Sequence, residues 1–166
     1  MNSLIVACAQ YLPYVIVAAA AVLWLMLARL DKVGLAVKGV VTLVLVGLLI
    51  VIGSALHTDP RPFVVDPSVR PLFPHPNDNG FPSDHTALSI AVAALVWGYR
   101  QALGVVLGVL ALVVGAARVL AHVHHTQDIV AGAVFGLIAA TLASLAWQAV
   151  EPRVAARFDR TLTVSR

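Results

Sequence analysis

The sequence has very few charged residues. Aspartate, glutamate, lysine and arginine make up 11% of its 166 residues, whereas 60% of the residues are hydrophobic. An average soluble domain has roughly 25% charged residues, so the charged side chains here are too few to cover a surface that faces water. The same shortage excludes intrinsic disorder, which requires low hydrophobicity and high charge. The composition therefore predicts a membrane protein.

Cysteine is almost absent. Cys8 is the only cysteine, so a scaffold held together by disulfides within the chain is excluded. The formal net charge is +3, but the basic residues form no patch interleaved with aromatic residues, and nucleic acid is not an expected partner. Since the sequence has no internal repeat and no second region of distinct composition, we expect one membrane-embedded domain over residues 1–166.

Five apolar stretches reach or approach the length that crosses a membrane. About 20 mainly apolar residues in a helix span roughly 30 Å of hydrocarbon, and helices leave no backbone polar group unpaired in lipid. We therefore predict an all-α fold, a polytopic integral membrane helix bundle with about five transmembrane helices. The predicted spans are residues 12–30, 39–56, 84–99, 102–120 and 128–150.

Basic residues are distributed unequally between the two sides that these spans define. The side with the C-terminal tail, residues 151–166, carries Arg29, Lys32, Lys38, Arg100, Arg153, Arg157, Arg160 and Arg166, and the other side carries Arg61, Arg70 and Arg118. Cytoplasmic segments carry the excess of lysine and arginine in membrane proteins. We therefore expect a bacterial inner-membrane protein with a cytoplasmic C-terminus and with the long segment 57–82 outside, in the periplasm of a Gram-negative cell. This orientation requires an odd number of spans.

The long polar segment, residues 57–82, holds seven of the nine prolines, so it is not a regular helix. Long loops of this kind are often functional. All six histidines also lie on the same predicted side, at positions 57, 75, 85, 122, 124 and 125. Because ionisable groups beside membrane spans are costly, their concentration on one side indicates a functional site.

Three clusters on this side have informative spacing. Arg61 follows the second span, Ser83 and His85 open the third, and Arg118 precedes His124 and Asp128, which are four residues apart. A carboxylate beside an imidazole fixes its tautomer, guanidinium groups suit phosphate oxygens, and a helix N-terminus favours an anion. The set indicates phosphoryl transfer, in which one imidazole attacks phosphorus and another protonates the leaving oxygen.

These clusters resemble the signature of the type 2 phosphatidic acid phosphatase (PAP2) superfamily, over roughly residues 40–150. That signature is Lys-x6-Arg-Pro, Pro-Ser-Gly-His and Ser-Arg-x5-His-x3-Asp, and the chain has Arg61-Pro62, Pro82-Ser83-Asp84-His85 and Ala117-Arg118-x5-His124-x3-Asp128. The resemblance implies that His124 is the nucleophile that forms a phosphohistidine, that Asp128 orients it, and that His85 is the general acid. It implies phosphate binding by Arg61, Ser83 and Arg118, and neither a cofactor nor a metal ion.

The chain departs from this signature at three positions. Ser54 stands in place of the lysine, Ala117 in place of the first serine of the third motif, and Asp84 in place of the glycine. Within the family, Pro-Ser-Asp-His without the lysine is similar to the undecaprenyl-diphosphate phosphatases associated with bacitracin resistance. This resemblance implies dephosphorylation of undecaprenyl diphosphate to undecaprenyl phosphate at the outer membrane face, which recycles the lipid carrier for peptidoglycan synthesis. Asp84, His75, Asp78 and Arg70 are candidate secondary site residues.

Other functions stay open at this point. Phosphatidylglycerophosphate, phosphatidate or lipid A are alternative substrates within the same family, and in each case the partner is a lipid of the bilayer. A function of another class is metal binding or transport by a histidine-rich membrane protein, since histidine and aspartate are suitable ligands. A transport path places its ligands near the bilayer midplane, however, whereas these residues lie at one edge. The sequence predicts no oligomeric state.

Overall fold

The chain folds into helices joined by short turns and one long loop. The computed structural model describes the backbone of residues 1–164 and the side chains of residues 1–156. The helices are α1 (Asn2–Gln10), α2 (Leu12–Met26), α3 (Arg29–Leu56), α4 (Pro62–Val65), α5 (Asp84–Trp97), α6 (Gln101–Leu120) and α7 (Thr126–Val164). Over the described residues β pairing is limited to an isolated bridge between Pro60 and Asn79. The predicted all-α fold is confirmed.

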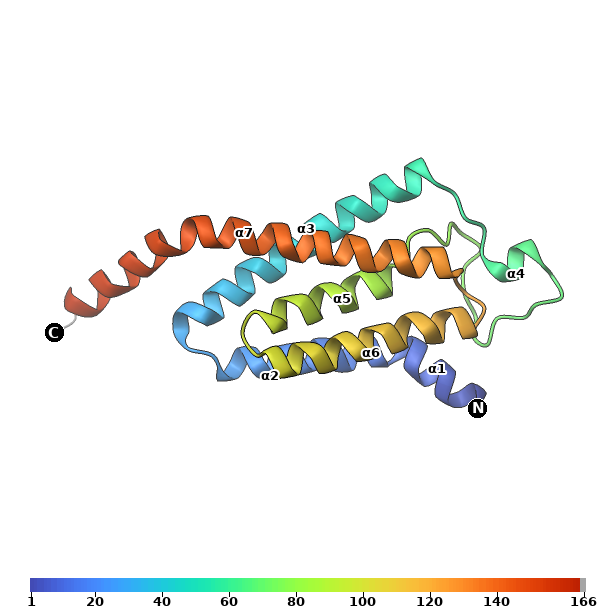
Figure 1. The fold of residues 1–166 in the computed structure, drawn as a ribbon, viewed down its shortest axis with the longest axis horizontal. Helices are drawn as coiled ribbons and strands as arrows, with labels where there is room; N and C mark the ends of the chain where they lie inside the picture. Colours follow the sequence, from blue (N-terminus) through green and yellow to red (C-terminus); the bar gives the residue numbers. More distant parts are fainter. Residues whose placement is uncertain (165–166) are drawn as a thin grey trace.

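The helices α2, α3, α5, α6 and α7 run back and forth along one long axis (Figure 1). The N-terminus, the loop that contains α4 and the turn between α6 and α7 lie at one end of this bundle. The turns between α2 and α3 and between α5 and α6 lie at the other end, as does the C-terminal end of α7. The polar segments that the sequence places on one side of a membrane therefore meet at one end of the molecule.

Fewer helices than predicted have the length of a membrane span by themselves. By length and composition α3, α6 and residues 126–156 of α7 qualify, and α1 with α2 makes a fourth span if the two, bent by 44°, are one broken span. Helix α5 has 14 residues, about 21 Å at 1.5 Å per residue. This short helix runs inside the bundle, where eight of its residues are buried.

The helix boundaries also differ from the prediction. Residues 29–38, expected as a connection, form the first turns of α3, and the first span ends at Met26 rather than at residue 30. Helix α7 continues through the predicted tail to Val164 and contains Pro152. The last two residues of the predicted tail lie outside the described residues. Polar composition marks where a helix leaves lipid, and it does not by itself end the helix.

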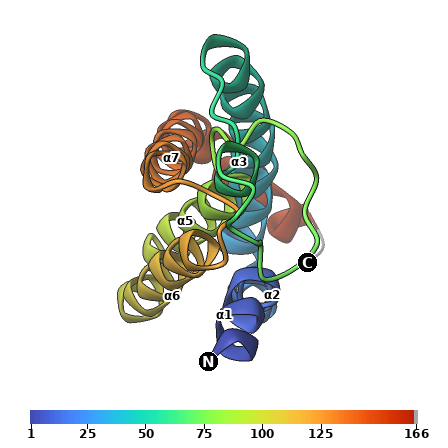
Figure 2. The same ribbon diagram turned by 90° about the vertical axis from the view of Figure 1, so that its right-hand side faces the viewer.

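Helix α5 is the centre of the bundle and contacts α2, α3, α6 and α7. Figure 2, which looks along the bundle from the end that carries the loop, shows α5 between α6, α7 and α3. Glycines allow its close contact with α7, because a Cβ atom at Gly132 would collide with the carbonyl oxygen of Ser83 and one at Gly136 with that of Ala87. Small residues four apart let helices approach closely in membranes. This crossing places the N-terminal turns of α5 and α7 side by side.

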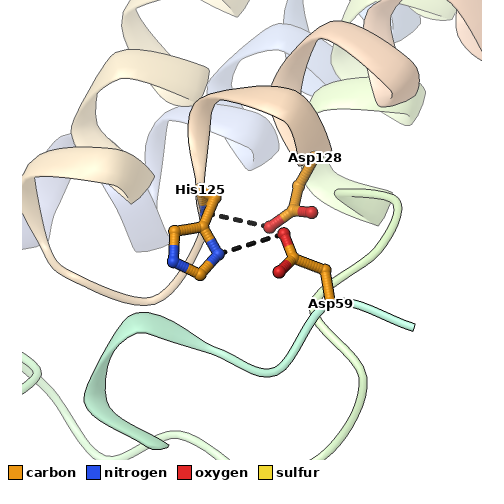
Figure 3. A group of neighbouring side chains, drawn as sticks. All are labelled: Asp59, His125 and Asp128. Carbon is orange, nitrogen blue, oxygen red and sulfur yellow. Dashed lines mark hydrogen bonds and ion pairs between the residues drawn. The ribbon is translucent and has the colours of Figure 1, made fainter. Parts of the chain in front are cut away.

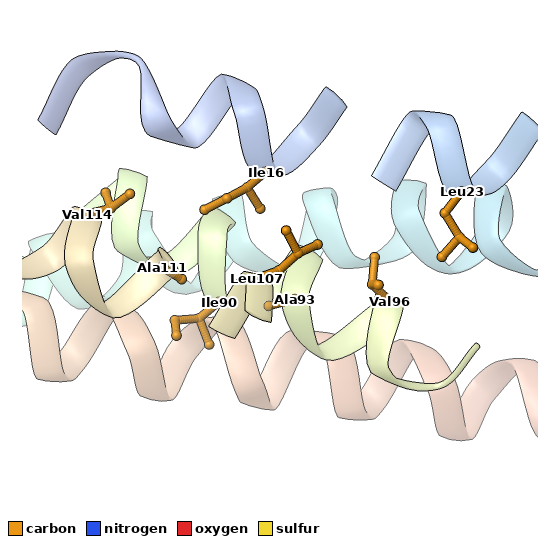
Figure 4. Packing of buried hydrophobic residues seen from close by; sticks show 8 residues of the cluster. All are labelled: Ile16, Leu23, Ile90, Ala93, Val96, Leu107, Ala111 and Val114. Atoms are coloured by element: carbon orange, nitrogen blue, oxygen red, sulfur yellow. The ribbon is translucent and has the colours of Figure 1, made fainter. Parts of the chain in front are cut away.

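Apolar side chains hold α2 against α5 and α6. Figure 4 shows this buried cluster, which consists of Ile16, Leu23, Ile90, Ala93, Val96, Leu107, Ala111 and Val114. Large apolar side chains also remain exposed on the outside of the bundle, such as Leu43 and Val51 of α3 and Val109 of α6. Extensive exposed apolar surface marks a protein that contacts a membrane or a partner. The outer surfaces of these helices are suited to hydrocarbon.

Candidate active site

His124 and Asp128 form a buried pair at the start of α7. His124 lies in the turn after α6, and Asp128 lies in the first turn of α7. Nδ1 of His124 is 3.2 Å from Oδ2 of Asp128, and the two side chains are only 2% and 0% exposed. The backbone N–H of His125 donates to the same oxygen at 2.9 Å. One carboxylate therefore fixes both the turn and the imidazole.

The surroundings of His124 determine its tautomer. Its Nε2 lies 3.4 Å from Nη1 of Arg61 and 3.3 Å from Nη2 of Arg118. A guanidinium group only donates hydrogen bonds, so Nε2 must be the acceptor and Nδ1 carries the proton that is donated to Asp128. The Nε2 lone pair is consequently directed at two positive charges, where a phosphate would bind.

Burial also favours the neutral imidazole. It lowers the pKa of His124 below its ordinary value, and the positive charges of Arg118 and Arg61 lower this pKa further, although the hydrogen bond to Asp128 opposes them. Removing a group from water disfavours its charged form. The neutral, nucleophilic form of His124 therefore persists to lower pH than it does in an exposed histidine.

Both arginines are buried and held from several sides. Arg61, 5% exposed, precedes α4, and its Nε donates to Oδ1 of Asp78 at 2.8 Å while its Nη1 donates to the carbonyl of Val123 at 2.7 Å. Arg118, 2% exposed, lies in the last turn of α6, and its Nη1 donates to the carbonyl of Ala9 at 3.4 Å. These contacts aim two fixed cations at one point, which is the arrangement that a phosphate dianion requires.

His85 lies at the N-terminus of α5 and lines a cavity of about 360 Å³ together with His75 and Arg118. Its Nδ1 is 2.7 Å from Oδ1 of Asp84. A carboxylate at this position accepts a hydrogen bond from an N–H on Nδ1. His85, Arg118, His124 and Asp128 are thus brought together at the loop end of the bundle.

Ser83 is placed differently from what a phosphate ligand requires. Its side chain is fully buried and forms the N-cap of α5, with Oγ 3.0 Å from Oγ1 of Thr86. Its backbone N–H donates to the carbonyl of Asp128 at 3.0 Å. The serine therefore joins α5 to α7, and phosphate binding by its hydroxyl stays a prediction.

Three of the four candidate secondary residues contact a main site residue. Asp78 accepts from Arg61, Asp84 accepts from His85, and Nε2 of His75 is 3.1 Å from Nη2 of Arg118. Burial and the charge of Arg61 lower the pKa of His75, which suits a neutral acceptor facing Arg118.

The fourth candidate, Arg70, does not join the site. Its side chain is exposed, and its carbonyl accepts a hydrogen bond from Nδ1 of His122 at 3.2 Å.

Sequence reasoning did not assign a role to Asp59. Its Oδ2 accepts from Nδ1 of His125 at 3.0 Å and from Nε2 of Gln127 at 2.6 Å. Figure 3 shows Asp59 facing His125 and Asp128, and one potential metal-ligating atom from each of these three residues lies within 4.8 Å of the others. Since Asp59 already receives two protein N–H donors, the geometry is that of a hydrogen-bonded support for the 124–128 turn.

Asn79 holds Asp59 in place. Its Oδ1 accepts from the backbone N–H of Asp59 at 2.9 Å, and its Nδ2 donates to the carbonyls of His57 at 2.9 Å and Ser54 at 3.2 Å. Asn79 therefore ties the end of α3 to the segment before α5. The polar composition of this loop is the only sequence signal for these contacts, because they join residues 20 or more positions apart.

Comparison with known proteins shows the family of this chain. The family model described as the PAP2 superfamily matches residues 35–152. The bacitracin transport permease protein BcrC of Bacillus licheniformis is 31% identical over 140 residues, which are 84% of this chain and 68% of that protein. Undecaprenyl-diphosphatase BcrC of Bacillus subtilis is 31% identical over 51% of this chain, and the putative undecaprenyl-diphosphatase YbjG of Escherichia coli is 38% identical over 54% of it. The matched regions span 44% and 46% of these last two proteins.

A solved structure is also similar to this chain. The crystal structure of Aquifex aeolicus LpxE superimposes with a TM-score of 0.70 at 26% sequence identity, over 86% of this chain and 84% of that one. The family model covers well over half of the chain, including every residue of the three motifs. This chain therefore belongs to the PAP2 superfamily and is a multi-pass membrane phosphatase that acts on lipid phosphate esters.

Proposed function

We propose that this phosphatase removes the terminal phosphate of undecaprenyl diphosphate through a phosphohistidine on His124. The observation that carries the proposal is the placement of Nε2 of His124 between the guanidinium groups of Arg61 and Arg118, with Nδ1 on Asp128. The relatives from B. subtilis and E. coli, whose names state undecaprenyl-diphosphatase activity, support this substrate.

The first step transfers the phosphoryl group. Arg61 and Arg118 bind the terminal phosphate, and Nε2 of His124 attacks its phosphorus. An N–P bond forms while the bond from phosphorus to the bridging oxygen breaks. His85 donates a proton to that oxygen, which leaves as undecaprenyl phosphate. Asp128 stabilises the positive charge that develops on the imidazole, as the carboxylate of a catalytic triad does.

The second step restores the enzyme. His85, now neutral, accepts a proton from a water molecule that attacks the phosphohistidine, and the N–P bond breaks to release inorganic phosphate. His124 returns to its neutral form with its proton on Nδ1. The positive charges of Arg61 and Arg118 stabilise the transferring group in both steps.

The site acts at the outer membrane face in this proposal, with the C-terminus in the cytoplasm. Arg29, Lys32, Lys38 and Arg100 belong to the end of the bundle opposite the site. At the site end Arg61 and Arg118 are buried. Of the far-end residues Arg29 and Arg100 are exposed and Lys32 and Lys38 are partly exposed, whereas Arg70 is the exposed arginine at the site end. The larger number of accessible basic residues at the far end supports a cytoplasmic location of that end.

The test is phosphate release by the purified protein from undecaprenyl diphosphate, phosphatidylglycerophosphate, phosphatidate and lipid A. We expect the highest kcat/KM with undecaprenyl diphosphate, and we expect His124→Ala to reduce turnover by at least about 10³-fold. His122→Ala is the matched control, because this neighbouring imidazole is exposed and its one side-chain hydrogen bond among the described residues is to the carbonyl of Arg70.

Two results would contradict the proposal. Substantial turnover by His124→Ala excludes this residue as the nucleophile, and a clear preference for another lipid replaces the substrate. A measurement of activity in EDTA tests the alternative function, metal binding. That alternative predicts a complete loss of activity that added zinc restores. We expect activity to survive EDTA, since cationic side chains supply the charge.

A further inference from the structure

Three polar side chains from the first two helices line the same cavity as His75, His85 and Arg118. They are Gln10 at the end of α1, Tyr11 at the bend and Tyr14 in the first turn of α2. None of the three belongs to a motif of the family. Nη2 of Arg118 lies 3.3 Å from Nε2 of His124, so the cavity lies next to the place where the transferred phosphate would bind. Side chains elsewhere in the cavity lining are therefore candidates to contact the part of the substrate attached to that phosphate.

The position of these side chains is fixed by contacts of α1 with α6. Ala9 and Ala117 belong to one buried cluster and are 0% and 5% exposed. The carbonyl of Ala9 accepts a hydrogen bond from Nη1 of Arg118. Ala117 stands where the family signature has a serine, and two methyl side chains allow the two helices to meet. The 44° bend that follows directs Gln10, Tyr11 and Tyr14 over the cavity.

The chemistry of these groups suits a second phosphate. An amide and two phenols donate hydrogen bonds without adding charge, and Tyr11 and Tyr14 are 62% and 70% exposed, so neither residue is enclosed by the rest of the protein. The cations Arg61 and Arg118 face His124 and are available to the phosphate that reacts. The phosphate that remains on the lipid needs donors next to them.

We infer that Gln10, Tyr11 and Tyr14 form a subsite for the lipid-linked phosphate of a diphosphate substrate. The inference rests on the proposed function and deepens it, because this subsite distinguishes a diphosphate from a monophosphate. It stands in for two donors of the family signature that are lost, the lysine at position 54 and the serine at position 117. The hydroxyl of Ser54 donates to the carbonyl of Val51 in its own helix and does not replace the lysine.

The experiment compares farnesyl diphosphate with farnesyl monophosphate, which share one prenyl chain. The variants are Tyr11→Phe, Tyr14→Phe and their combination, which remove only the hydroxyls. We expect kcat/KM for the diphosphate to fall about tenfold for each lost hydrogen bond to a charged oxygen. Turnover of the monophosphate is expected to stay within about twofold, which also shows that the variants fold. Tyr99→Phe, beside Lys38 at the far end of the bundle, is the matched control.

Each outcome is decisive. A selective loss on the diphosphate supports the subsite. An equal loss on both substrates, or no loss on either, overturns it while the proposed function stands. If the unmodified enzyme hydrolyses another lipid phosphate but neither the farnesyl substrates nor undecaprenyl diphosphate, the proposed function fails and the subsite fails with it.

Discussion

At the scale of single residues, the site is built around positive charge that the protein only partly neutralises. Two buried guanidinium groups face the Nε2 lone pair of His124. Asp78 contacts one of them, but its side chain is 60% exposed, so water weakens that ion pair. Burying charge without full compensation is costly. A phosphate dianion would provide the missing compensation, which supports the proposed binding of phosphate by Arg61 and Arg118.

The activity should depend on pH through His124. The protonated imidazole has no lone pair for attack, and the pKa of His124 is lowered by burial and by both arginines. We therefore expect kcat/KM to decrease with falling pH only below about pH 6.5, which is the ordinary pKa of histidine. Arg61→Gln removes a positive charge that lowers the pKa of His124, so this decrease should move to higher pH, whereas Arg61→Lys should leave it in place.

The measurement is the pH dependence of kcat/KM between about pH 4 and pH 8, a range that includes the ordinary histidine pKa of about 6.5. The other ionisable groups that face His124 are Asp128, Arg118 and His75, and they are unchanged in both variants. A decrease that moves to lower pH in Arg61→Gln would contradict the electrostatic account.

Asp59 should act as a positioning residue. Asp59→Asn retains the size of the side chain but removes the negative charge that accepts from His125 and Gln127. Because these two residues follow His124 in the 124–128 turn, kcat should fall about tenfold, which is the order of loss when the hydrogen-bonded support of a metal-ligating histidine is removed, with KM unchanged. Asp66→Asn is the control, because Asp66 is an exposed aspartate in the same loop, residues 57–82. A change in KM alone would show that Asp59 acts in substrate binding instead.

At the scale of helices, the crossing of α5 and α7 assembles the site. It places Ser83, the N-cap of α5, beside Asp128 at the start of α7, and the backbone N–H of Ser83 donates to the carbonyl of Asp128. The contact depends on the absence of side chains at Gly132 and Gly136. Helix packing and catalytic geometry are thus controlled by the same two positions.

Gly136→Ala should damage both stability and activity. Its Cβ would collide with the carbonyl oxygen of Ala87 and approach the backbone nitrogen of Ala91 to 3.1 Å. Overpacking of this kind costs about 1–3 kcal/mol. The apparent Tm in detergent and phosphate release should both decrease. Gly108→Ala is the control, since no atom lies within 4 Å of its Cβ, and alanine favours a helix by about 1 kcal/mol. Equal effects of the two substitutions would contradict the packing argument.

At the scale of the whole molecule, the bundle separates a histidine-rich end from an end that carries more of the basic residues. At the second end Nε1 of Trp24 donates to the carbonyl of Lys32 at 2.9 Å, and Nζ of Lys38 lies 4.2 Å from the ring centre of Tyr99. Aromatic and basic side chains are enriched where a helix meets the membrane surface. This polarity predicts the orientation of the protein in the membrane.

Cysteine labelling tests that orientation. In a Cys8→Ala background, Ser68→Cys lies in the long loop and Gln101→Cys lies at the start of α6, and both positions are exposed. A membrane-impermeant maleimide added to intact cells should label the cysteine at position 68, and should label that at position 101 only after permeabilisation. The reverse pattern would place the active site in the cytoplasm.

The sequence alone determined the membrane class, the all-α fold, the long loop and the pairing of His124 with Asp128. Composition is a local property, and His124 and Asp128 are four residues apart, so the short turn before α7 is enough to bring them together. Only the tertiary structure decided which distant groups complete the site. Asp59 meets His125 across 66 positions and Arg118 meets the carbonyl of Ala9 across 109. The tertiary structure also shows that the hydroxyl of Ser83 caps helix α5 and that the side chain of Arg70 is exposed and lies outside the site. These contacts depend on where helices cross and bend, which small residues and buried side chains fix collectively rather than one position at a time.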